Sequence, residues 1–526
     1  MSRKRTFLLA ALLVAAAFII FTARKIFDYA AAPLSAKDSN FVFPQASDQE
    51  KPTVLISEPK APPITFTQLG GFTNDASHLN KTAIYGLVHV STEADVRSAL
   101  QFARDHNLKI SCAGQQHSMG GQTFTHGGLI LDFRDFNRIQ LDEQLKTVNV
   151  QSGVRWWQLQ QLLDKHGLSV KSMQSINIFS IGGSLSINAH GIDPAPGQIA
   201  PTVQRLRVML SDGSIVIASP TENADLFRHV LGGYGLFGVI LDADLSVVDN
   251  ELYDRRAVYL DYKDFPAYYR AHIEGNDQVG LAFGRISISP TSYLRETAIH
   301  IYTRTQLKDS LPPLTPPKME TFDRFVINFS KTGGVGRWFR WSLEKYLEPR
   351  LHTCISRNEA MNQKADCLVS RNQEMYDDMA YLKNRLHDTD ILQEYFVPYD
   401  RMPEFVDALR ETVQANKANL LNVTIRTVHK DNVTALPYAK QDMFAFVLYF
   451  NVKFNEHDNE VLKKTTSDLV DATERSGGTY YLPYQLFYSP EQLHKAYPEA
   501  GDFFASKRKY DPTVLFSNQF YEKYGM

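Results

Sequence analysis

Residue types suited to cofactor chemistry are concentrated in one segment, from Ser111 to Phe133, which reads SCAGQQHSMGGQTFTHGGLILDF. Glycine has no Cβ and tolerates positive φ, so the backbone can pass close to a bulky charged ligand. Consecutive N–H groups of such a loop form a concavity suited to phosphate oxygens. His117 is the one side chain of the loop that can be a nucleophile toward an electrophilic cofactor near neutral pH. Taken alone, the segment fits a glycine-rich hairpin with a solvated histidine equally well.

Two further glycine-rich segments follow along the chain. Residues Ser180 to Asp193 read SIGGSLSINAHGID, and residues Leu231 to Ile240 read LGGYGLFGVI. All three lie beside apolar runs and fall within about one domain's length. This arrangement predicts one long, diphosphate-containing ligand threaded between strands.

Together the segments resemble the FAD domain of the vanillyl-alcohol-oxidase-type flavoproteins, also called the p-cresol-methylhydroxylase (PCMH) type. HSMGGQ at His117–Gln122 is similar to the flavin-linking loop of cytokinin dehydrogenases and aldonolactone oxidases. GGSLSINAHG at Gly182–Gly191 is similar to the pyrophosphate and isoalloxazine loop of the aldonolactone oxidases. Asn223–Ile240 matches the closing strand–helix–strand of that domain. The resemblance is strong over Thr82–Val248 and weaker toward the C-terminus, where the tail resembles that of decaprenylphosphoryl-ribose oxidases.

The resemblance implies FAD as the cofactor. His117 is implied either as an 8α-histidyl flavin link or as a non-covalent neighbour of the ring, because relatives of both kinds exist; Gln116 stands where a small residue usually precedes the histidine. No Cys/His spacing typical of a metal site is present, so no metal is predicted. The residues assigned to the cofactor are Gly114, His117, Ser118, Gly120, Gly121, Gln122, Ser180, Gly182, Gly183, Ser186, Asn188, His190, Gly191, Gly232, Gly233, Gly238 and Asn518.

Three residues are candidates for catalysis. A flavin enzyme must orient the donor carbon, take up a proton and stabilise negative charge. Arg426, in LNVTIRTV, falls on the Arg of the Glu-X-Arg pair of aldonolactone oxidases, with Thr424 at the Glu position; Glu394 lies in LQEYFVP. Tyr484 stands where the ribose-oxidase relatives use a lysine. The alternative for Glu394 and Arg426 is an ion pair on strands at the surface of the cap.

The predicted fold is α+β, with a two-subdomain FAD-binding domain of PCMH type and an antiparallel-sheet cap. The expected units are a membrane anchor or signal segment at 1–30, a linker at 31–70, the FAD-binding domain at 71–250, the cap at 251–479, and a C-terminal segment at 480–526 that returns to the FAD domain. Ser91–His106 is predicted to be a helix capped by Ser91 or Thr92. An aromatic and basic segment, Phe322–His352, is interpreted as a helix that packs on the sheet, borders the substrate pocket or lies on lipid.

The N-terminus predicts an association with a membrane. An apolar run from Phe7 to Phe21 lies between Arg3-Lys4-Arg5 and Arg24-Lys25. It fits an uncleaved anchor helix or a signal peptide; an anchor is favoured because the nearest small-residue cleavage site, Ala30–Ala32, lies well downstream. The charge bias places the catalytic body outside the cytoplasm, in a periplasm. A net charge of −2 gives no reason to expect a nucleic-acid partner.

The function predicted from these features is hydride removal from a CH–OH carbon of a sugar, aldonolactone or polyprenyl-linked sugar. The electrons then pass to oxygen or to another acceptor, which the sequence leaves open. The alternative is a flavin-dependent reductase of a C=C bond in a lipid or sterol, which the same fold supports.

Overall fold

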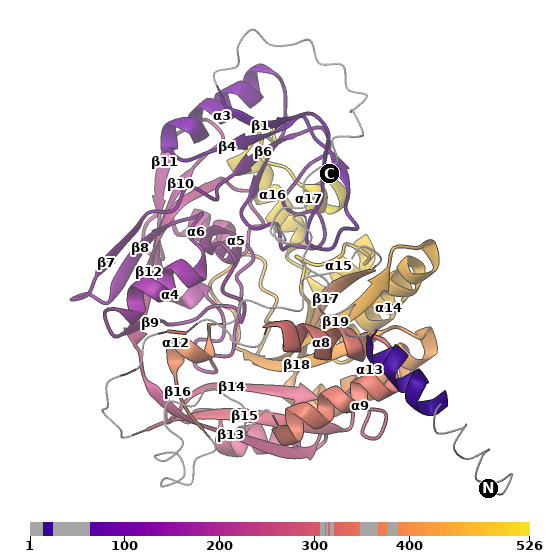
Figure 1. Cartoon of the computed structure of the whole chain (residues 1–526). Coiled ribbons are helices and arrows are strands. Elements are labelled where there is room, and N and C mark those ends of the chain that lie inside the picture. Colours follow the sequence, from indigo (N-terminus) through magenta and orange to yellow (C-terminus); the bar gives the residue numbers. More distant parts are fainter. Residues whose placement is uncertain are drawn as a thin grey trace, which may run out of the picture.

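The computed structural model describes residues 14–24, 64–305, 311, 314–315, 320–347, 367–376 and 388–526. Figure 1 shows two small sheets of the N-terminal half at the top and left, and a large sheet below and to the right that forms the cap. The C-terminal helices lie back against the N-terminal half. This is the mixed α/β architecture with a sheet-rich cap that the sequence predicts.

The first subdomain is a four-stranded sheet with the order β1-β4-β6-β5, in which β4, β6 and β5 are parallel and β1 is antiparallel to β4. Helix α3 begins at the N-cap Thr92, and Asp95 completes a capping box with it, as predicted. Strands β2 and β3 form a separate two-stranded antiparallel ribbon. The elements are β1 Phe66–Leu69, β2 Phe72–Thr73, β3 Thr82–Ala83, β4 Gly86–His89, α3 Glu93–Asp105, β5 Ile110–Ala113 and β6 Leu129–Asp132.

The linker expected at 31–70 is too long at its C-terminal end. Strand β1 falls inside it, because the sequence FTQL presents alternate residues to the sheet and pairs with β4. Residues 31–63 lie outside the described residues.

The second subdomain is an antiparallel sheet with the order β11-β10-β12-β8-β7, and β9 pairs with one end of β12. The segment after Ser180, which the sequence analysis treats as a loop, is instead the short helix α5. Gly182 allows this helix to pack on the sheet, because a Cβ there would lie 2.5 Å from that of Ser152. The elements are β7 Ile139–Asp142, β8 Thr147–Gln151, α4 Trp156–Asp164, β9 Leu168–Val170, α5 Ile181–Ser186, a 3₁₀ turn Ala200–Thr202, β10 Val203–Met209, β11 Ile215–Ala218, α6 Ala224–Val230 and β12 Val239–Asp249.

The cap is an eight-stranded antiparallel sheet with the order β16-β13-β15-β14-β18-β19-β17-β20. Its strands are β13 Leu252–Asp261, β14 Val279–Ile286, β15 Glu296–Arg304, β16 Cys367–Ser370, β17 Asp388–Pro398, β18 Leu420–Val428, β19 Met443–Lys453 and β20 Thr479–Tyr480. Its helices are α7 Phe265–His272, α8 Glu320–Lys331, α9 Gly334–Ser342 with a π turn at Leu343–Leu347, α12 Arg371–Glu374, a 3₁₀ turn Tyr399–Arg401, α13 Met402–Asn416 and α14 Glu456–Arg475.

The two faces of the cap sheet have different neighbours. On β17, Tyr395 packs against Phe405 of α13 with ring centroids 5.9 Å apart, and Gln393 bonds to Thr466 of α14. Strand residues alternate between faces, so Glu394 and its neighbours at even positions point to the opposite face. That face is turned toward the N-terminal half, where Glu394 meets His190.

The tail returns to the first subdomain, as predicted. Its helices are α15 Pro490–Ala496, α16 Ala500–Tyr510 and α17 Gln519–Tyr524. Phe516 bridges Ile110 of β5 in parallel, with the Ile110 N–H donating to Leu515 O at 2.7 Å. Residues of the tail share one apolar core with the cap and the second subdomain.

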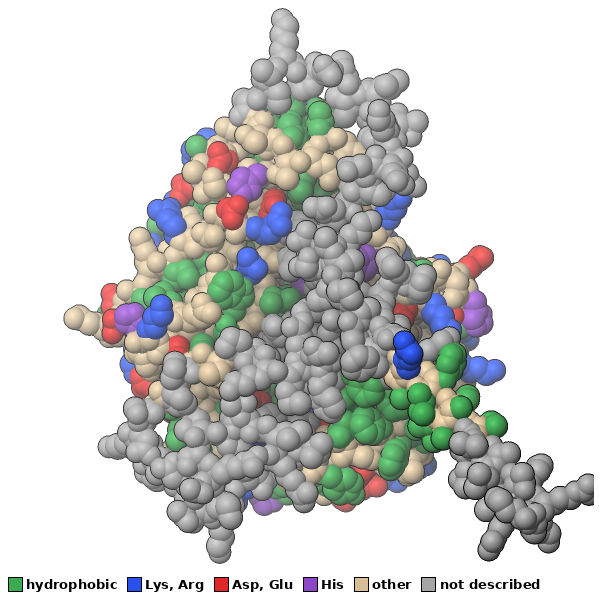
Figure 2. Space-filling model, in the orientation of Figure 1, with side chains coloured by type: hydrophobic (Ala, Val, Ile, Leu, Met, Phe, Trp, Pro, Cys, Tyr) green, Lys and Arg blue, Asp and Glu red, His purple; other side chains and the backbone are tan. Residues whose placement is uncertain are grey.

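The predicted anchor lies mostly outside the described residues. Residues 14–24 are helical and expose large apolar side chains, with Phe18 70% exposed and Ile20 67% exposed; Figure 2 shows them as green side chains at the lower right. Among the described residues, no helix is both long and apolar enough to cross a membrane. The anchor therefore stays a prediction.

Candidate functional site

A cavity of about 1080 Å³ lies between the two subdomains and the tail. We call it the glycine-lined cavity. Its wall includes Gly114, His117, Ser118, Gln122, Ser180, Gly182, Gly183, Ser186 and Gly238, all of which the sequence assigns to a cofactor.

Other predicted residues lie behind this wall. The Gly120 N–H donates to Gln122 Oε1 at 3.0 Å. A Cβ on Gly191 would lie 1.8 Å from Met173 O, and one on Gly233 would lie 1.9 Å from His229 O. Gly191 and Gly233 permit close packing of backbone against backbone. From the sequence, the same glycines are predicted to lie close to the ligand.

The same holds for the predicted asparagines and for Gly232. Asn188 accepts from the Ala200 N–H at 3.0 Å and donates to Asp431 at 3.0 Å. Asn518 caps α17 and donates to Tyr234 O at 2.8 Å. Since Tyr234 lines the cavity, Asn518 acts on the wall through it. Gly232 has a φ of 65° and also lies off the wall.

The loop that carries His117 is held on both sides. The Gly121 N–H donates to Asp75 Oδ2 at 3.0 Å, and the Met119 N–H donates to Pro483 O of the tail at 2.9 Å. The Gln122 amide donates to Leu482 O at 2.8 Å. Burial raises the pKa of Asp75 to about 6, and its hydrogen bonds to Ser77, Asn80 and Gly121 oppose that rise. The loop position therefore depends on a carboxylate that is buried within the domain.

The His117 ring lies 4.3 Å from the ring of Phe179, centroid to centroid. Burial lowers its pKa to about 3, so the imidazole is neutral at any working pH. In a neutral imidazole one ring nitrogen carries an in-plane lone pair and can act as a nucleophile. Gln116, directly before it, has a φ of 51°, which is uncommon for a residue other than glycine and turns the loop at this point.

Several buried polar side chains on the cavity wall have atoms with no hydrogen-bond partner among the described residues. They are the amides of Gln115 and Gln116 and the hydroxyls of Thr123 and Ser152. Folded proteins leave few such groups unsatisfied. Their concentration here supplies donors and acceptors for a polar ligand. None of these four residues belongs to the glycine-rich motifs that predict the cofactor site, and Gln116 departs from the family pattern.

A second cavity, of about 850 Å³, lies between the inner face of the cap sheet and the N-terminal half. We call it the cap cavity. It shares Phe179, Ile187, Leu392 and Tyr484 with the glycine-lined cavity, so the two adjoin. Glu394, Arg426 and Tyr484, the predicted catalytic residues, all line it, together with His190.

Strand register explains how distant parts of the cap meet in this cavity. Glu394 of β17 pairs with Val447 of β19, Val447 pairs with Thr424 of β18, and Thr424 pairs with Arg285 of β14. All four line the cap cavity. They form one row across four strands, which we call the cap row. Arg426 is two residues from Thr424 on β18 and therefore lies on the same face.

His190 and Glu394 form a buried pair. His190 Nε2 lies 2.5 Å from Glu394 Oε1, and the two residues are 2% and 3% exposed. The two atoms are close enough for an ion pair, but they are not aligned for a hydrogen bond. The partner of Glu394 is thus His190, and neither an Arg426–Glu394 pair nor a position at the cap surface is observed. His190, assigned to the cofactor from sequence, lines the cap cavity.

Arg426 and Tyr484 complete this end of the cavity. Arg426 Nη1 donates to His190 O at 3.3 Å, and its Nε–H is buried with no partner among the described residues. Burial, and then the charge of Glu394, raise the pKa of Tyr484 well above its usual range, while Arg426 acts in the opposite direction. Tyr484 is therefore a neutral phenol that can donate a hydrogen bond.

Comparison with known proteins identifies the ligand of the glycine-lined cavity. The model of the FAD binding domain family matches residues 85–219, which form α3, the His117 loop, α5 and most of the cavity wall. This chain carries an FAD-binding domain. FAD is its cofactor, and the unpartnered polar atoms and neutral His117 on the wall fit such a ligand.

Similar curated proteins include oxidases and a dehydrogenase. L-gulonolactone oxidase of Mus musculus is 32% identical over 155 residues, which are 29% of this chain and 35% of the mouse protein. The match thus spans about a third of that relative. L-gulonolactone oxidase of Bos taurus is 22% identical over 82% of this chain and 92% of its own length. Cytokinin dehydrogenase 9 of Oryza sativa subsp. japonica is 20% identical over 86% of this chain and 88% of its own length.

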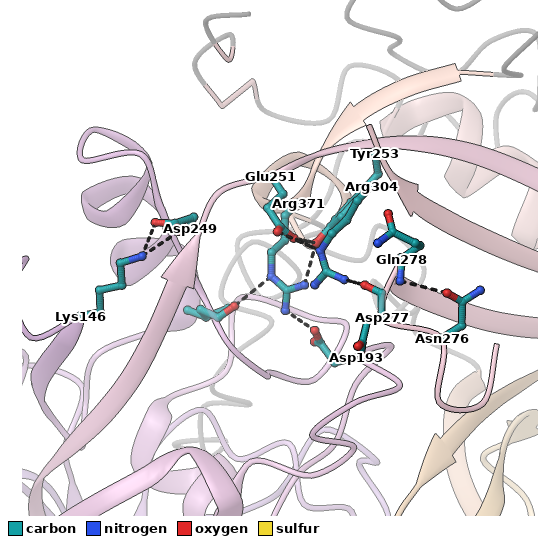
Figure 3. A network of polar contacts seen from close by, with 11 residues as sticks. Lys146, Asp193, Asp249, Glu251, Tyr253, Asn276, Asp277, Gln278, Arg304 and Arg371 are labelled. Carbon is teal, nitrogen blue, oxygen red and sulfur yellow. Dashed lines mark hydrogen bonds and ion pairs between the residues drawn. The ribbon is translucent and has the colours of Figure 1, made fainter. Parts of the chain in front are cut away.

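A buried arginine connects the FAD-binding domain to the cap. Arg371 of α12 forms an ion pair with Asp193 and donates to Tyr253 Oη at 3.1 Å (Figure 3). It also donates to Lys171 O at 2.8 Å. Burial raises the pKa of Asp193 to about 6, and the charge of Arg371 opposes that rise. Asp193 is three residues from His190, so this contact fixes the segment that carries His190. Arg371 is not predicted from the sequence, because the residues around it resemble those of an ordinary surface helix.

Proposed function

We propose that this protein is an FAD-dependent oxidoreductase that oxidises a CH–OH carbon of a sugar, aldonolactone or lipid-linked sugar. The observation that carries the proposal is the buried Glu394–His190 pair beside Arg426, at the point where the cap cavity adjoins the FAD-binding cavity. A carboxylate, an imidazole, a guanidinium and a phenol at one place are what alcohol oxidation asks of a protein: proton uptake, charge stabilisation and orientation of the hydroxyl.

When bound, FAD supplies the acceptor of the hydride that leaves the carbon. The Glu394 carboxylate takes up the hydroxyl proton, so that the O–H bond electrons form the carbonyl. His190, 2.5 Å from that carboxylate, shares the proton and can pass it on. The Arg426 guanidinium is cationic and stabilises the negative charge that develops on the donor oxygen as its proton leaves. Tyr484 donates a hydrogen bond that orients the hydroxyl.

The composition of the cap cavity supports a hydroxylated substrate over an apolar one. Besides the residues above, its wall presents Gln174, Ser175, Asn422 and Thr424. The buried Nε–H groups of Arg285 and Arg426 on the same wall have no partner among the described residues. A sterol ring or an acyl chain that covered them would leave both unsatisfied. This argues for alcohol oxidation over reduction of a C=C bond in a lipid.

The test is anaerobic reduction of the purified, yellow protein by a panel of sugars and aldonolactones. The fall in flavin absorbance measures the reduction. Bleaching by at least one polyol without NADPH supports the proposal. Bleaching by NADPH and by none of the alcohols would instead favour the C=C reductase.

We also propose His117 as the point of flavin attachment. Its neutral ring and its place on the wall support this. Acid precipitation should leave flavin in the pellet for the wild type and release it from His117→Ala. Release from the wild type as well would reduce His117 to a non-covalent neighbour of the ring.

The apolar run Phe7–Phe21 supports a further proposal, that the chain is anchored by its N-terminus with the catalytic body outside the cytoplasm. Membrane fractionation of the full chain, with sequencing of its mature N-terminus, tests this. Recovery in the soluble fraction with a new N-terminus near Pro33 would identify a cleaved signal.

A further inference from the structure

A cationic cluster lies on the cap cavity at the opposite end of the cap row from Glu394. Arg285 of β14 and Arg340 of α9 both line the cavity. Both reach one carboxylate: Arg285 Nη2 lies 2.8 Å and Arg340 Nε 2.9 Å from Glu344 Oε1. Arg340 is 8% exposed and also donates to Leu421 O at 2.8 Å. The cluster is thus held rigidly by β18 and by the turn after α9.

The charge of this cluster is not balanced. Two guanidinium groups share the single carboxylate of Glu344, which does not itself line the cavity. Glu344 therefore lies behind the pair, and the side turned to the cavity is cationic. In addition, the Nε–H of Arg285 is buried with no partner among the described residues. A buried donor on a charged group without an acceptor is costly, and an anion would satisfy it.

The cap row sets the distance from this cluster to the reacting end. Arg285 and Glu394 are separated by the paired residues Thr424 and Val447, hence by three strand spacings. At about 4.8 Å per strand, their Cα atoms lie about 14 Å apart. A ligand whose hydroxyl carbon meets Glu394 and His190 can therefore place its far end at Arg285.

We propose that Arg285 and Arg340 form an anion subsite that holds a phosphate or carboxylate group of the substrate, remote from the carbon that is oxidised. This rests on the proposed function for the oxidised end of the molecule. The substrate class is thereby a sugar or sugar acid with an anionic group at the end opposite its reacting hydroxyl. Two adjacent guanidinium forks favour an oxyanion because each can donate two parallel hydrogen bonds.

The first experiment measures binding of inorganic phosphate to the FAD-loaded protein by isothermal titration calorimetry and needs no turnover. Arg285→Gln should weaken binding roughly tenfold to a hundredfold, the range for loss of a hydrogen bond to a charged group. Glu344→Gln should strengthen binding by about tenfold, because it removes the carboxylate that competes for both arginines. Arg256→Gln is the matched control: Arg256 lies on β13 of the same sheet, pairs with Asp254 and is not on the cavity wall.

Arg285→Gln and Glu344→Gln are expected to change phosphate affinity in opposite directions. If the cluster were only structural, both substitutions would weaken it and phosphate affinity would not rise in either variant. The proposal is overturned if the wild type does not bind phosphate, if Arg285→Gln equals the control, or if Glu344→Gln weakens binding.

The second experiment compares flavin reduction by a sugar phosphate, a uronate and the corresponding neutral sugar. The preference in kcat/KM for the better anionic donor over the neutral sugar should fall by roughly tenfold to a hundredfold in Arg285→Gln, and the better donor identifies phosphate or carboxylate as the natural group. If none of the three reduces the flavin, the proposed function fails, while the phosphate titration still decides the subsite.

Discussion

Replacement of Arg426 by methionine tests the charge that the cap cavity supplies to the reaction. Methionine retains most of the length of the side chain and removes only the guanidinium. The three arginines of the cavity differ in how their charge is used. Arg285 and Arg340 share Glu344, whereas Arg426 has no ion-pair partner among the described residues and contacts the His190 carbonyl at 3.3 Å.

The size of the effect follows from this difference. A unit charge about 4 Å from a developing negative charge contributes roughly 4 kcal/mol at an effective dielectric constant of about 20. That corresponds to about a thousandfold in rate, and loss of a preorganised donor typically costs about 10²–10³. We therefore expect Arg426→Met to retain FAD but to slow its reduction by substrate by about 10²–10³. The lost bond to His190 O should cost roughly 1.5–3 kcal/mol of stability at most.

The assay is stopped-flow reduction under anaerobic conditions, together with titration by sulfite, which adds to oxidised flavin more tightly when a positive charge is near. The sulfite titration needs no knowledge of the substrate. Arg256→Met removes a guanidinium from β13 of the same sheet but away from the cavity wall, and serves as the control. Reduction rates and sulfite affinity within about threefold of wild type for Arg426→Met would refute an electrostatic role.

Three further outcomes are expected. Gly114→Ala should lose FAD and about 1–3 kcal/mol of stability, because its Cβ would lie 1.9 Å from Ser180 Oγ; the double variant with Ser180→Gly should recover both, as measured by flavin content and thermal melting. Burial raises the pKa of Asp75 to about 6, so its contribution to stability is present below about pH 4 and is lost as the pH rises through 6. The advantage of wild type over Asp75→Asn in urea unfolding should therefore be smaller at pH 7.5 than at pH 4.5 by about 2 kcal/mol. An equal advantage at both pH values would contradict the buried charge. Arg371→Met should cost about 3–5 kcal/mol by leaving Asp193 buried and unpaired, and Asp193→Asn in the same chain should restore part of it; no loss on unfolding in urea would show that the contact is dispensable.

The wall of the glycine-lined cavity was largely predictable because its residues come from contiguous segments. His117, Ser118 and Gln122 lie within six residues of one another, and a short motif identifies them together. The glycines were harder to interpret. Gly191 and Gly233 are required by neighbouring backbone atoms at 1.8 Å and 1.9 Å from an added Cβ, and a sequence does not distinguish that need from closeness to a ligand.

The cap cavity was only partly predictable, because it depends on register. Glu394, Val447, Thr424 and Arg285 lie far apart along the chain, and only strand pairing places them in one row. Local resemblance identifies Glu394 and Arg426 from the sequence. The alternative of an ion pair between them is wrong, because Glu394 lies against His190. Arg285 and Arg340 carry no local signal, since an arginine in a strand or an amphipathic helix is usually a surface residue.

The return of the tail has a consequence for how the protein is made. Phe516 adds to the edge of β5, Asn518 holds Tyr234 on the cavity wall, and Leu482 and Pro483 fasten the His117 loop. The glycine-lined cavity is therefore assembled from segments that are about 400 residues apart in the chain, around His117 and around Asn518. Domains usually fold as they leave the ribosome, N-terminal part first, but here the cavity cannot be completed until the segment that ends at Asn518 is synthesised. A chain that stops before Leu482 keeps every glycine-rich segment and still lacks part of the cavity wall, so flavin retention distinguishes chains with residues 482–518 from chains without them.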